Sequence, residues 1–307
     1  RLHGCRSPSR LKLELWPLQS NRSLPRITKR RGIFKGIMAT TSSPHPRPEN
    51  YPSYRKASAQ EGPTFRNSQQ RARSARAFAH GADTYHDVRP SYPYEVAALI
   101  SSAHSVLDIG AGTGKLTETL TNPEVYASDP SPDMARVLTR LGVPCWRATA
   151  EETALSDSSL DAITCAQTWH WVDEKSACAE FDRVLRPGGR VVLVWNTLDV
   201  GADPWILRLS RIMHSGDVQR PGFYPTIAPP WEIREELRLT WEHTLTPEQL
   251  HQLMHTRSYW LRNGEKIHER MTYNLNWYLY EHMGLHPGQK LAIPYRTDAF
   301  VLARPGE

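Results

Sequence analysis

Long apolar runs are missing from this sequence, and cysteine is scarce. No stretch reaches the ~18 consecutive apolar residues that a membrane-spanning helix requires, so we expect a soluble, cytoplasmic protein. Only 4 of the 307 residues are cysteines, and none stands in a C-x-x-C pair. This usage argues against a disulfide framework or a metal site such as zinc, and it fits a reducing compartment. No internal repeat is present either.

A basic face is also missing from most of the chain, although the net charge is +6. Residues 1–75 carry 16 Lys/Arg against 3 Asp/Glu, whereas residues 76–307 carry 22 against 29. The larger segment is therefore acidic and is not suited to follow nucleic-acid phosphates. For this segment we expect neither nucleic acid nor membrane as a partner.

The first 75 residues are rich in Arg, Ser and Pro and show little periodic apolar pattern. Such a composition cannot offset the ~1–2 kcal/mol per residue that backbone ordering costs, so it predicts a disordered basic head. Met38 is a second candidate start, which would make residues 1–37 an upstream or artefactual segment. A mitochondrial presequence and a nucleic-acid- or membrane-binding tail stay open as alternatives.

From residue 76 to residue 201, short apolar runs alternate with segments of helical spacing. Repeated strand–helix units of this length predict an α/β fold with a doubly wound, mostly parallel sheet, in which ligands bind beyond the carboxyl ends of the strands. Pro187, Gly188 and Gly189 are predicted to turn the last helix into the last strand. The predicted strands are 105–110, 125–129, 144–150, 160–167 and 190–196, and the predicted helices are 115–120, 132–142 (Ser131 N-cap, Gly142 stop) and 173–185.

Residues 202–289 differ because they are rich in Trp, Tyr and His and show helical spacing in two blocks. The first block, 246–261, begins with a Thr-Pro start signal, and the second, 265–284, ends on glycine. We predict a helical, aromatic cap that closes an apolar pocket and also contains the sixth strand. Residues 290–307 alternate enough to predict a final strand, at an edge or in a hairpin, that completes the sheet.

The segment VLDIGAGTGK, residues 106–115, joins a predicted strand to a glycine loop. A triphosphate-binding loop would need Ser or Thr after Lys115, and the nicotinamide fingerprint would need a glycine at position 115. The pattern present is D-x-G-x-G-x-G, with Asp108, Gly110, Gly112 and Gly114. Glycines at these positions would let backbone amides approach a ligand closely.

Two segments and one acidic residue together resemble the class I S-adenosylmethionine-dependent methyltransferases. They are VLDIGAGTGKL, the acidic Asp129 that ends the second strand, and EFDRVLRPGGRVVLVWN at 180–196. YHDVRPSYP (85–93), AQTWHWVDEKSACAE (166–180) and IPYRT (293–297) are similar to small-molecule methyltransferases of the type 11, trans-aconitate-like group. The resemblance covers about residues 77–304. It implies a Rossmann-like sheet of seven strands with an antiparallel last strand, and S-adenosylmethionine as cofactor.

Two departures from the family pattern affect the expected shape of the pocket. ATAEETALS lacks the usual Gly and Pro after the third strand, and Trp169 and Val172 stand where Phe is common. By resemblance, Asp129 would accept hydrogen bonds from both ribose hydroxyls and Glu151 would lie near the adenine edge. A helix-capping role for Asp129 and a solvated Glu151 are the alternatives. The cofactor-binding residues that the resemblance implies are Tyr85, Arg89 and Tyr92 (as a lid), Asp108, Gly110, Gly112, Gly114, Asp129, Ala150, Glu151 and Gln167.

Three residues after the fourth strand are candidates for the chemistry: Gln167, His170 and Trp171. His170 could act as a base near neutral pH, or it could only orient its neighbours. Electron-rich rings there would favour a sulfonium cation, although Trp169 or Trp171 could equally belong to the core.

Arg257, Tyr295 and Arg296 are candidate substrate residues, and Arg89 is a further candidate anchor, because a guanidinium binds a carboxylate bidentately. Each arginine could instead form an ordinary ion pair. We predict methyl transfer to a small organic molecule, with a carboxylate-bearing acceptor as one option. The alternatives are a nucleic-acid methyltransferase that uses the basic head, and a non-catalytic ligand-binding protein of the same fold.

Overall fold

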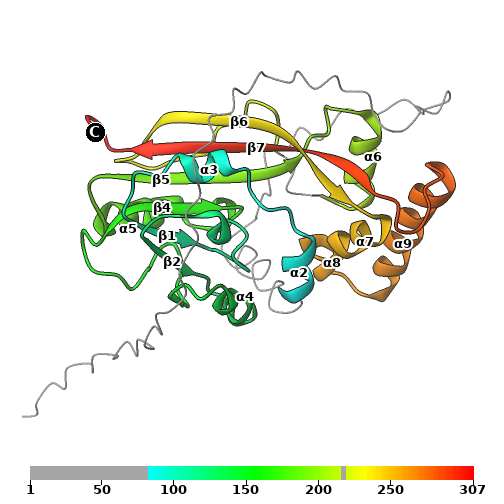
Figure 1. Ribbon diagram of the computed structural model, residues 1–307, viewed down its shortest axis with the longest axis horizontal. Helices are drawn as coiled ribbons and strands as arrows, with labels where there is room; N and C mark the ends of the chain where they lie inside the picture. Colours follow the sequence, from blue (N-terminus) through cyan, green and yellow to red (C-terminus); the bar gives the residue numbers. More distant parts are fainter. Residues whose placement is uncertain (1–81, 216–218) are drawn as a thin grey trace, which may run out of the picture. The chain divides into compact units, whose positions relative to one another are not determined.

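A seven-stranded sheet organises the computed structural model, which describes residues 82–215 and 219–307 (Figure 1). The basic head predicted for residues 1–75 lies outside the described residues. The strand order is β3-β2-β1-β4-β5-β7-β6. The strands are β1 Ser105–Ile109, β2 Glu124–Ser128, β3 Cys145–Trp146, β4 Leu160–Ala166, β5 Leu185–Leu198, β6 Glu232–Leu245 and β7 Leu291–Ala303.

The first five strands pair in parallel, and β7 runs antiparallel to both of its neighbours. This arrangement confirms the predicted mostly parallel sheet with an antiparallel last strand. The prediction of an edge position for β7 was wrong, because β7 lies between β5 and β6 and is buried along most of its length. The edge strand is β6, whose exposed positions are mostly charged or polar.

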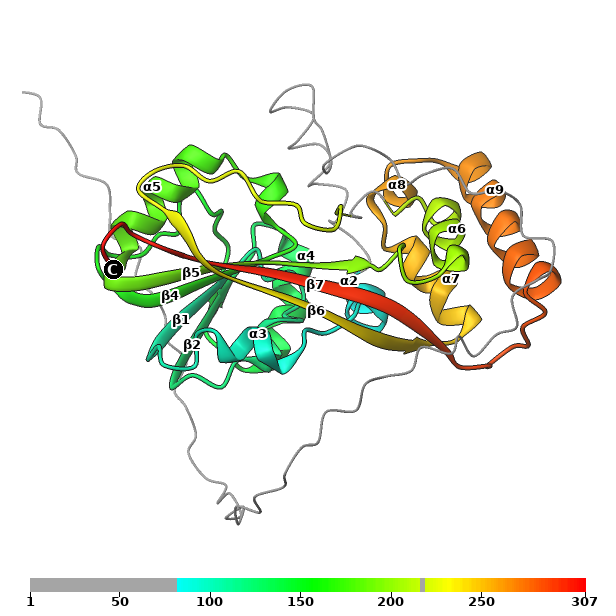
Figure 2. The same cartoon turned by 90° about the horizontal axis from the view of Figure 1, so that it is seen from above.

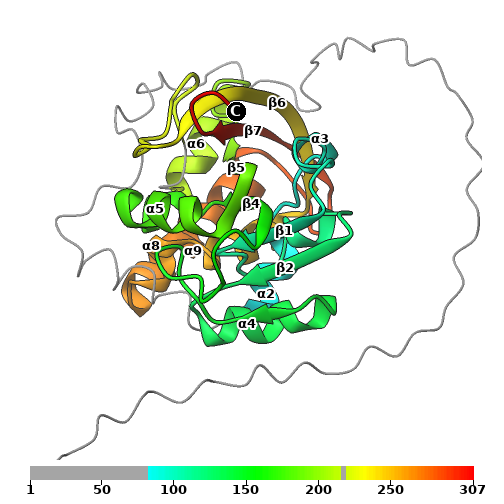
Figure 3. The same cartoon turned by 90° about the vertical axis from the view of Figure 1, so that its left-hand side faces the viewer.

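Helices cover both faces of the sheet (Figure 3). On one face, α5 (Glu174–Val184) buries Ala177, Phe181 and Val184, which is the apolar face that the spacing predicted. The opposite face carries α3 (Tyr94–Ala98), which packs Val96 against the β-strand core. The sheet therefore lies between two apolar layers, and this packing holds the carboxyl ends of its strands in fixed positions.

Three local predictions need correction. The helix expected at 115–120 is a single 3₁₀ turn, η1 (Thr117–Thr119), and the third strand has two residues instead of seven. Pro187–Gly189 lies inside β5, because Leu185 already pairs with Leu160 and pairing resumes at Arg190 after a register shift. The Pro-Gly-Gly segment is therefore a bulge that the sheet absorbs.

The helix after β2 begins and ends where the sequence predicts. In α4 (Pro132–Leu138), the Ser131 side chain accepts a hydrogen bond from the Met134 amide. A 3₁₀ turn, η2 (Thr139–Leu141), follows and ends at Gly142, which has a left-handed φ of 71°. Since glycine adopts this conformation without steric cost, it stops the helix.

The remaining helices form a cap beyond the ends of β5, β6 and β7 (Figure 2). Thr246 starts α7 with a full capping box, as its Thr-Pro signal predicts, but the helix breaks at Thr256 before α8. None of the helices within the described ranges is long and apolar enough to cross a bilayer. The cap consists of α6 Pro204–Ile212, α7 Pro247–His255, α8 Ser258–Leu261, α9 Glu265–Asn276 and the π-helical turn η4 Trp277–His282.

Candidate functional site

The glycine loop after β1 forms a cradle that is closed at both ends. Gly110, Gly112 and Gly114 all have positive φ, at 61°, 58° and 91°. A Cβ added at Gly110 would lie 2.3 Å from Thr168 Cγ2, and one at Gly114 would lie 2.3 Å from Leu141 Cδ1. At Gly112, no described atom would lie within 4 Å. The middle of the loop therefore faces open space, whereas its two ends are packed against protein.

Asp129 stands at the carboxyl end of β2, opposite this open middle. Its Oδ2 accepts a hydrogen bond from the Gly112 amide at 2.9 Å, and its Oδ1 accepts one from the Ser131 amide at 2.8 Å. Burial raises the pKa of Asp129, and these two bonds act in the opposite direction. A carboxylate offers about four lone-pair sites, so Asp129 keeps acceptor capacity after both bonds are made.

Asp108 supports the loop from within the protein. Both of its carboxylate oxygens accept hydroxyl hydrogen bonds, from Thr117 at 2.6 Å and Thr164 at 2.8 Å. Burial raises the pKa of Asp108 to about 6. Since the side chain is fully buried, Asp108 fixes the base of the loop and ties it to β4.

The loop after β4 meets the glycine loop side by side. Gln167 adopts a positive φ of 54°, and its amide nitrogen donates to the Asn196 carbonyl. Its Oε1 is buried and has no partner among the described residues. The hydroxyl of Thr168 lies 3.0 Å from the carbonyl oxygen of Gly110, which joins the two loops. Gln167 therefore presents an unused acceptor beside the cradle.

The structure separates the roles of the two tryptophans in the 3₁₀ turn η3 (Trp169–Trp171). Trp169 is 3% exposed, donates from Nε1 to the Thr226 carbonyl at 2.9 Å, and packs against Phe181. It belongs to the core. His170 and Trp171 are half-buried, with ring centroids 4.8 Å apart. The turn η3 therefore contributes the His170 and Trp171 rings to the candidate site.

Glu151 and Ala150 connect the segment after β3 to the start of α5. Ala150 is buried, and the Glu151 carboxylate accepts a hydrogen bond from the Asp173 amide at 2.8 Å. Asp173 is the N-cap of α5 and accepts from the Ser176 amide. Glu151 is thus held in place by protein groups at the carboxyl edge of the sheet.

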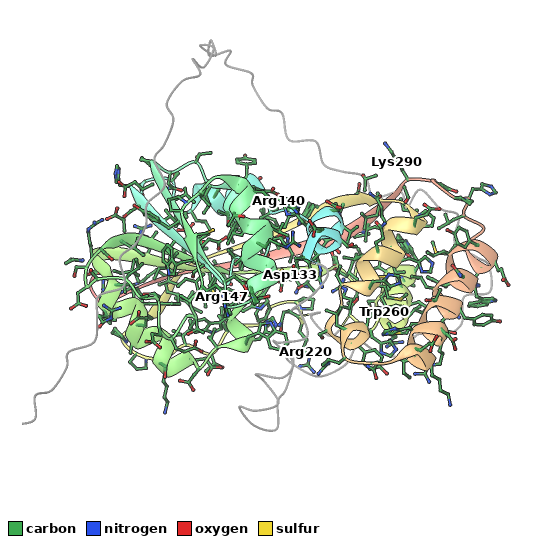
Figure 4. All side chains as sticks on the ribbon, turned by 90° about the horizontal axis from the view of Figure 1, so that it is seen from below. Asp133, Arg140, Arg147, Arg220, Trp260 and Lys290 are labelled. Carbon is green, nitrogen blue, oxygen red and sulfur yellow. The ribbon has the colours of Figure 1, made fainter. Side chains whose placement is uncertain are left out.

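The helix α2 (Ala82–Val88) connects the two parts of the site. At its start, the Ala82 amide donates to Asp133 of α4 at 3.0 Å; Asp133 and its neighbour Arg140 are labelled in Figure 4. After its end, the Arg89 guanidinium donates from Nε and Nη2 to the hydroxyl and carbonyl of Thr256, both at 3.0 Å. This α2 bridge spans from α4, beside the glycine-loop side of the sheet, to the cap.

Two of the three predicted lid residues are ordered by this bridge. Arg89 lies over the Tyr85 ring at 4.7 Å, and both side chains are half-buried. Tyr92 follows the bridge, and burial raises the pKa of its phenol well above the usual value. Tyr92 therefore stays protonated and can act as a hydrogen-bond donor.

The three predicted substrate residues are all buried. Arg296 donates from Nε to Asp298 at 2.8 Å and from Nη2 to the Gln219 carbonyl at 2.9 Å. It shares the Asp298 carboxylate with Arg238, and its role as a substrate anchor stays a prediction. Arg257 is 4% exposed at the start of α8, and Tyr295 is 2% exposed on β7.

Asn196 is a site residue that the sequence analysis did not identify. It ends the apolar run of β5, and its Nδ2 donates to the Ser91 carbonyl at 2.9 Å. Its Oδ1 accepts a hydrogen bond from the Thr297 hydroxyl at 2.6 Å, and its carbonyl accepts from Gln167. The available signal was a polar residue at the carboxyl end of a buried strand, where ligand sites form in such sheets.

Comparisons with known proteins agree with this geometry. Residues 107–193 match the family model described as a methyltransferase domain. An uncharacterized methyltransferase of Mycobacterium tuberculosis (strain ATCC 25618 / H37Rv) is 39% identical over 229 residues, covering 72% of this chain and 93% of that protein. An uncharacterized methyltransferase-like protein of Schizosaccharomyces pombe is 31% identical over 238 residues, covering 70% of this chain and 91% of that protein.

A solved structure from Anaeromyxobacter dehalogenans, named as a type II methyltransferase, shows the same fold. Its TM-score is 0.51 at 22% identity, and the match covers 70% of this chain and 97% of that one. The relatives share most of their own length with this chain, and the fold places the glycine loop and Asp129 at the edge where such sheets bind ligands. The chain therefore belongs to the class I S-adenosylmethionine-dependent methyltransferase family.

Proposed function

We propose that this protein transfers the methyl group of S-adenosylmethionine to a small organic acceptor that binds between the carboxyl edge of the sheet and the cap. The observation that carries the proposal is the cradle at Gly112, which is open in the middle and faces Asp129. The hydrogen-bonding groups of this cradle fit the cofactor. Backbone amides suit the methionine carboxylate, and a carboxylate with spare lone pairs suits two ribose hydroxyls.

The cofactor, when bound, supplies an electrophilic methyl group on a positively charged sulfur. The residues that would hold it are the glycine loop, Asp129, the segment at Ala150 and Glu151, and Gln167. Gln167 Oε1 lacks a partner, so it would accept a hydrogen bond from a ligand group. The ring faces of His170 and Trp171 would favour a neighbouring cation.

Positioning accounts for much of the rate in this kind of displacement, because two reactants are held in line in a site that excludes water. The α2 bridge closes one side of the site through its bonds to Asp133 and Thr256. The cap supplies apolar walls from its aromatic residues. Arg89, Arg257 and Arg296 are the candidates to bind a carboxylate group of the acceptor.

A second candidate function rests on the charge of residues 1–75, which carry 16 Lys/Arg against 3 Asp/Glu. In that case the basic head would recruit a nucleic acid to the same site. Removal of residues 1–75 distinguishes the two functions. Methylation of a small molecule should continue without the head, whereas methylation of a nucleic acid should be lost with it.

The test of the proposed function is isothermal titration of the full-length chain with S-adenosylhomocysteine, followed by an acceptor screen that starts with small carboxylic acids. We expect micromolar binding and a methylated product detected by mass spectrometry. Titration with NAD serves as the control and should give no heat. A folded protein that does not bind S-adenosylhomocysteine would refute the proposal, and binding without turnover across a broad panel would favour a ligand-binding protein.

A further inference from the structure

A ring of hydrogen bonds joins the two ends of the glycine loop, and its first half runs through the loop after β4. At the start of the glycine loop, the Thr168 hydroxyl lies 3.0 Å from the Gly110 carbonyl oxygen. A Cβ added at Gly110 would lie 2.3 Å from Thr168, so the two loops are in contact there. The neighbouring Gln167 donates from its side-chain amide to the Asn196 carbonyl near the end of β5. The start of the glycine loop is therefore connected to Asn196.

The second half of the ring runs from Asn196 to the other end of the glycine loop. Asn196 Nδ2 donates to the Ser91 carbonyl at 2.9 Å. The Ser91 hydroxyl lies 3.3 Å from the carbonyl oxygen of Lys115, which directly follows Gly114, and 3.4 Å from a carboxylate oxygen of Glu118. Asn196 therefore connects the two halves, one through its backbone carbonyl and the other through its side chain.

Groups with a single possible role determine how the Asn196 amide is oriented. Trp241 Nε1 can only donate, and it lies 2.8 Å from the Thr297 hydroxyl oxygen. The Thr297 hydroxyl therefore gives its own hydrogen to Asn196 at 2.6 Å, and the atom that receives it is Oδ1. The Ser91 carbonyl on the other side can only accept, which places Nδ2 there. Both ends of this buried amide are thus committed to protein groups.

The segment that carries Ser91 is also bound to the cap. Two residues earlier, the Arg89 guanidinium donates to the hydroxyl and the carbonyl of Thr256, both at 3.0 Å. This segment is the connection between α2 and α3 in Figure 1. It has one attachment in the cap and one at the glycine loop, and the bond from Asn196 ties it to the sheet between them.

We propose that Asn196 is a positioning residue for the cofactor: its side chain holds Ser91, and through Ser91 it fixes the Lys115 end of the glycine loop. The inference rests on the proposed function, because it takes S-adenosylmethionine as the ligand of this loop. Backbone amides that converge on a carboxylate lose hydrogen-bond geometry when one end of their loop moves. Asn196 acts through the loop and not by contact with the ligand.

Asn196→Ala in the full-length chain removes the bond to Ser91 and keeps the backbone carbonyl that belongs to the first half of the ring. We expect S-adenosylhomocysteine binding to weaken about 10-fold in calorimetry. Asn122→Ala is the matched control, because Asn122 Nδ2 also donates to backbone carbonyls, those of Ile100 and Ala103 at 2.8 Å, but precedes β2 at the amino edge of the sheet. Wild-type affinity in Asn196→Ala, or an equal loss in both variants, would overturn the proposal.

Ser91→Ala tests the path through the loop at a half-buried position where a smaller side chain is tolerated. It removes the hydroxyl near Lys115 and keeps the carbonyl that Asn196 binds. We expect S-adenosylhomocysteine binding to weaken about 3-fold, and no further loss when Ser91→Ala is added to Asn196→Ala. Fully additive losses would contradict the proposal, because the two side chains would then act separately.

The kinetic readout separates positioning from stability. A merely structural role would reduce the fraction of folded enzyme, which lowers kcat and leaves KM unchanged. With an acceptor from the screen, Asn196→Ala should instead raise the KM for S-adenosylmethionine about 10-fold and keep kcat within about 3-fold of wild type. A fall in kcat at unchanged KM would refute the positioning role.

Hydrogen exchange followed by mass spectrometry needs neither ligand nor acceptor. The amides of Gly112 and Gly114 are hydrogen-bonded, to Asp129 and Ala111, so the loop is protected in the wild type. We expect faster exchange at residues 110–116 in Asn196→Ala and no such change in Asn122→Ala. Unchanged exchange there would overturn the inference. If the wild type fails to bind S-adenosylhomocysteine, the proposed function fails, and this comparison still decides whether Asn196 holds the loop.

Discussion

The half of the sheet from β1 to β4 and the cap, formed by α6 to α9, hold their buried polar groups differently. In the first half, Asp108 and Asp129 each accept two short hydrogen bonds from hydroxyl or amide donors. In the cap, Trp260, which is labelled in Figure 4, is stacked against His255 and His268, with ring centroids 4.0 Å and 3.9 Å away. Hydrogen-bonded carboxylates fix the backbone around them, whereas the ring stack is tied to the backbone by one polar contact, between His268 Nε2 and the Trp260 carbonyl at 2.8 Å.

This difference corresponds to the two ligands that the site is proposed to bind. A cofactor can be held by a backbone cradle, which the first half is proposed to provide. An acceptor that differs between relatives needs a surface that can be repacked, and aromatic side chains provide one without changing the fold. Changes in the first half should therefore affect folding and cofactor affinity, and changes in the cap should affect turnover.

The largest effect is expected from a methyl group added at the closed end of the cradle. In Gly110→Ala, the new Cβ would lie between 2.3 Å and 2.8 Å from three side-chain atoms of Thr168, and the left-handed φ adds strain. We expect a loss of ~3 kcal/mol or more in the free energy of unfolding, measured by chemical denaturation.

Gly112→Ala is the matched comparison, because it has the same backbone strain without a described neighbour within 4 Å. It should lose only ~1 kcal/mol of stability but should weaken S-adenosylhomocysteine binding. Equal destabilisation by the two substitutions would mean that the packing of Gly110 against Thr168 contributes little.

The next effect concerns affinity rather than folding. Asp129→Ala removes the carboxylate proposed to bind the ribose and should weaken S-adenosylhomocysteine binding by ~1–3 kcal/mol in calorimetry. Asp161→Asn is the control, since Asp161 pairs with Arg186 and Ser105 at the amino edge of the same strands. A similar loss in both variants would show a general effect on the sheet and remove the specific role of Asp129.

The sequence predicted best those features that local signals determine. The glycines with positive φ, the Ser131 N-cap and the helix stop at Gly142 each determine the backbone only within a few residues. The position of β7 between β5 and β6, and the bond from Arg296 to the Gln219 carbonyl, depend on partners far away in the chain. Asn196 could not be identified from its neighbours in sequence, because its partners Ser91 and Thr297 lie more than 100 residues away in the chain.

The smallest effect is a difference in acid response between the two halves. Burial lowers the pKa of the cap histidines His214, His251 and His255, so the folded cap binds fewer protons than the unfolded chain. Their contribution to stability is present above the ordinary histidine pKa of ~6.5 and is lost as the pH falls below it. Asp108 behaves oppositely, because its pKa is raised to about 6 and its ionised form is the costly one.

Acidification from pH 7 to pH 5 should therefore loosen the cap while the β1 region becomes slightly more stable. Hydrogen exchange followed by mass spectrometry, corrected for the intrinsic pH dependence of exchange, should show faster exchange in α7 and α9 than in β1 and β4. Each half-exposed ring contributes less than ~1 kcal/mol, so the change is graded.

His255→Phe keeps a ring against Trp260 but cannot be protonated, and it should reduce the acid response of α7. A uniform response across both halves would mean that the two regions unfold as one unit and that the contrast in their buried groups has no consequence for stability.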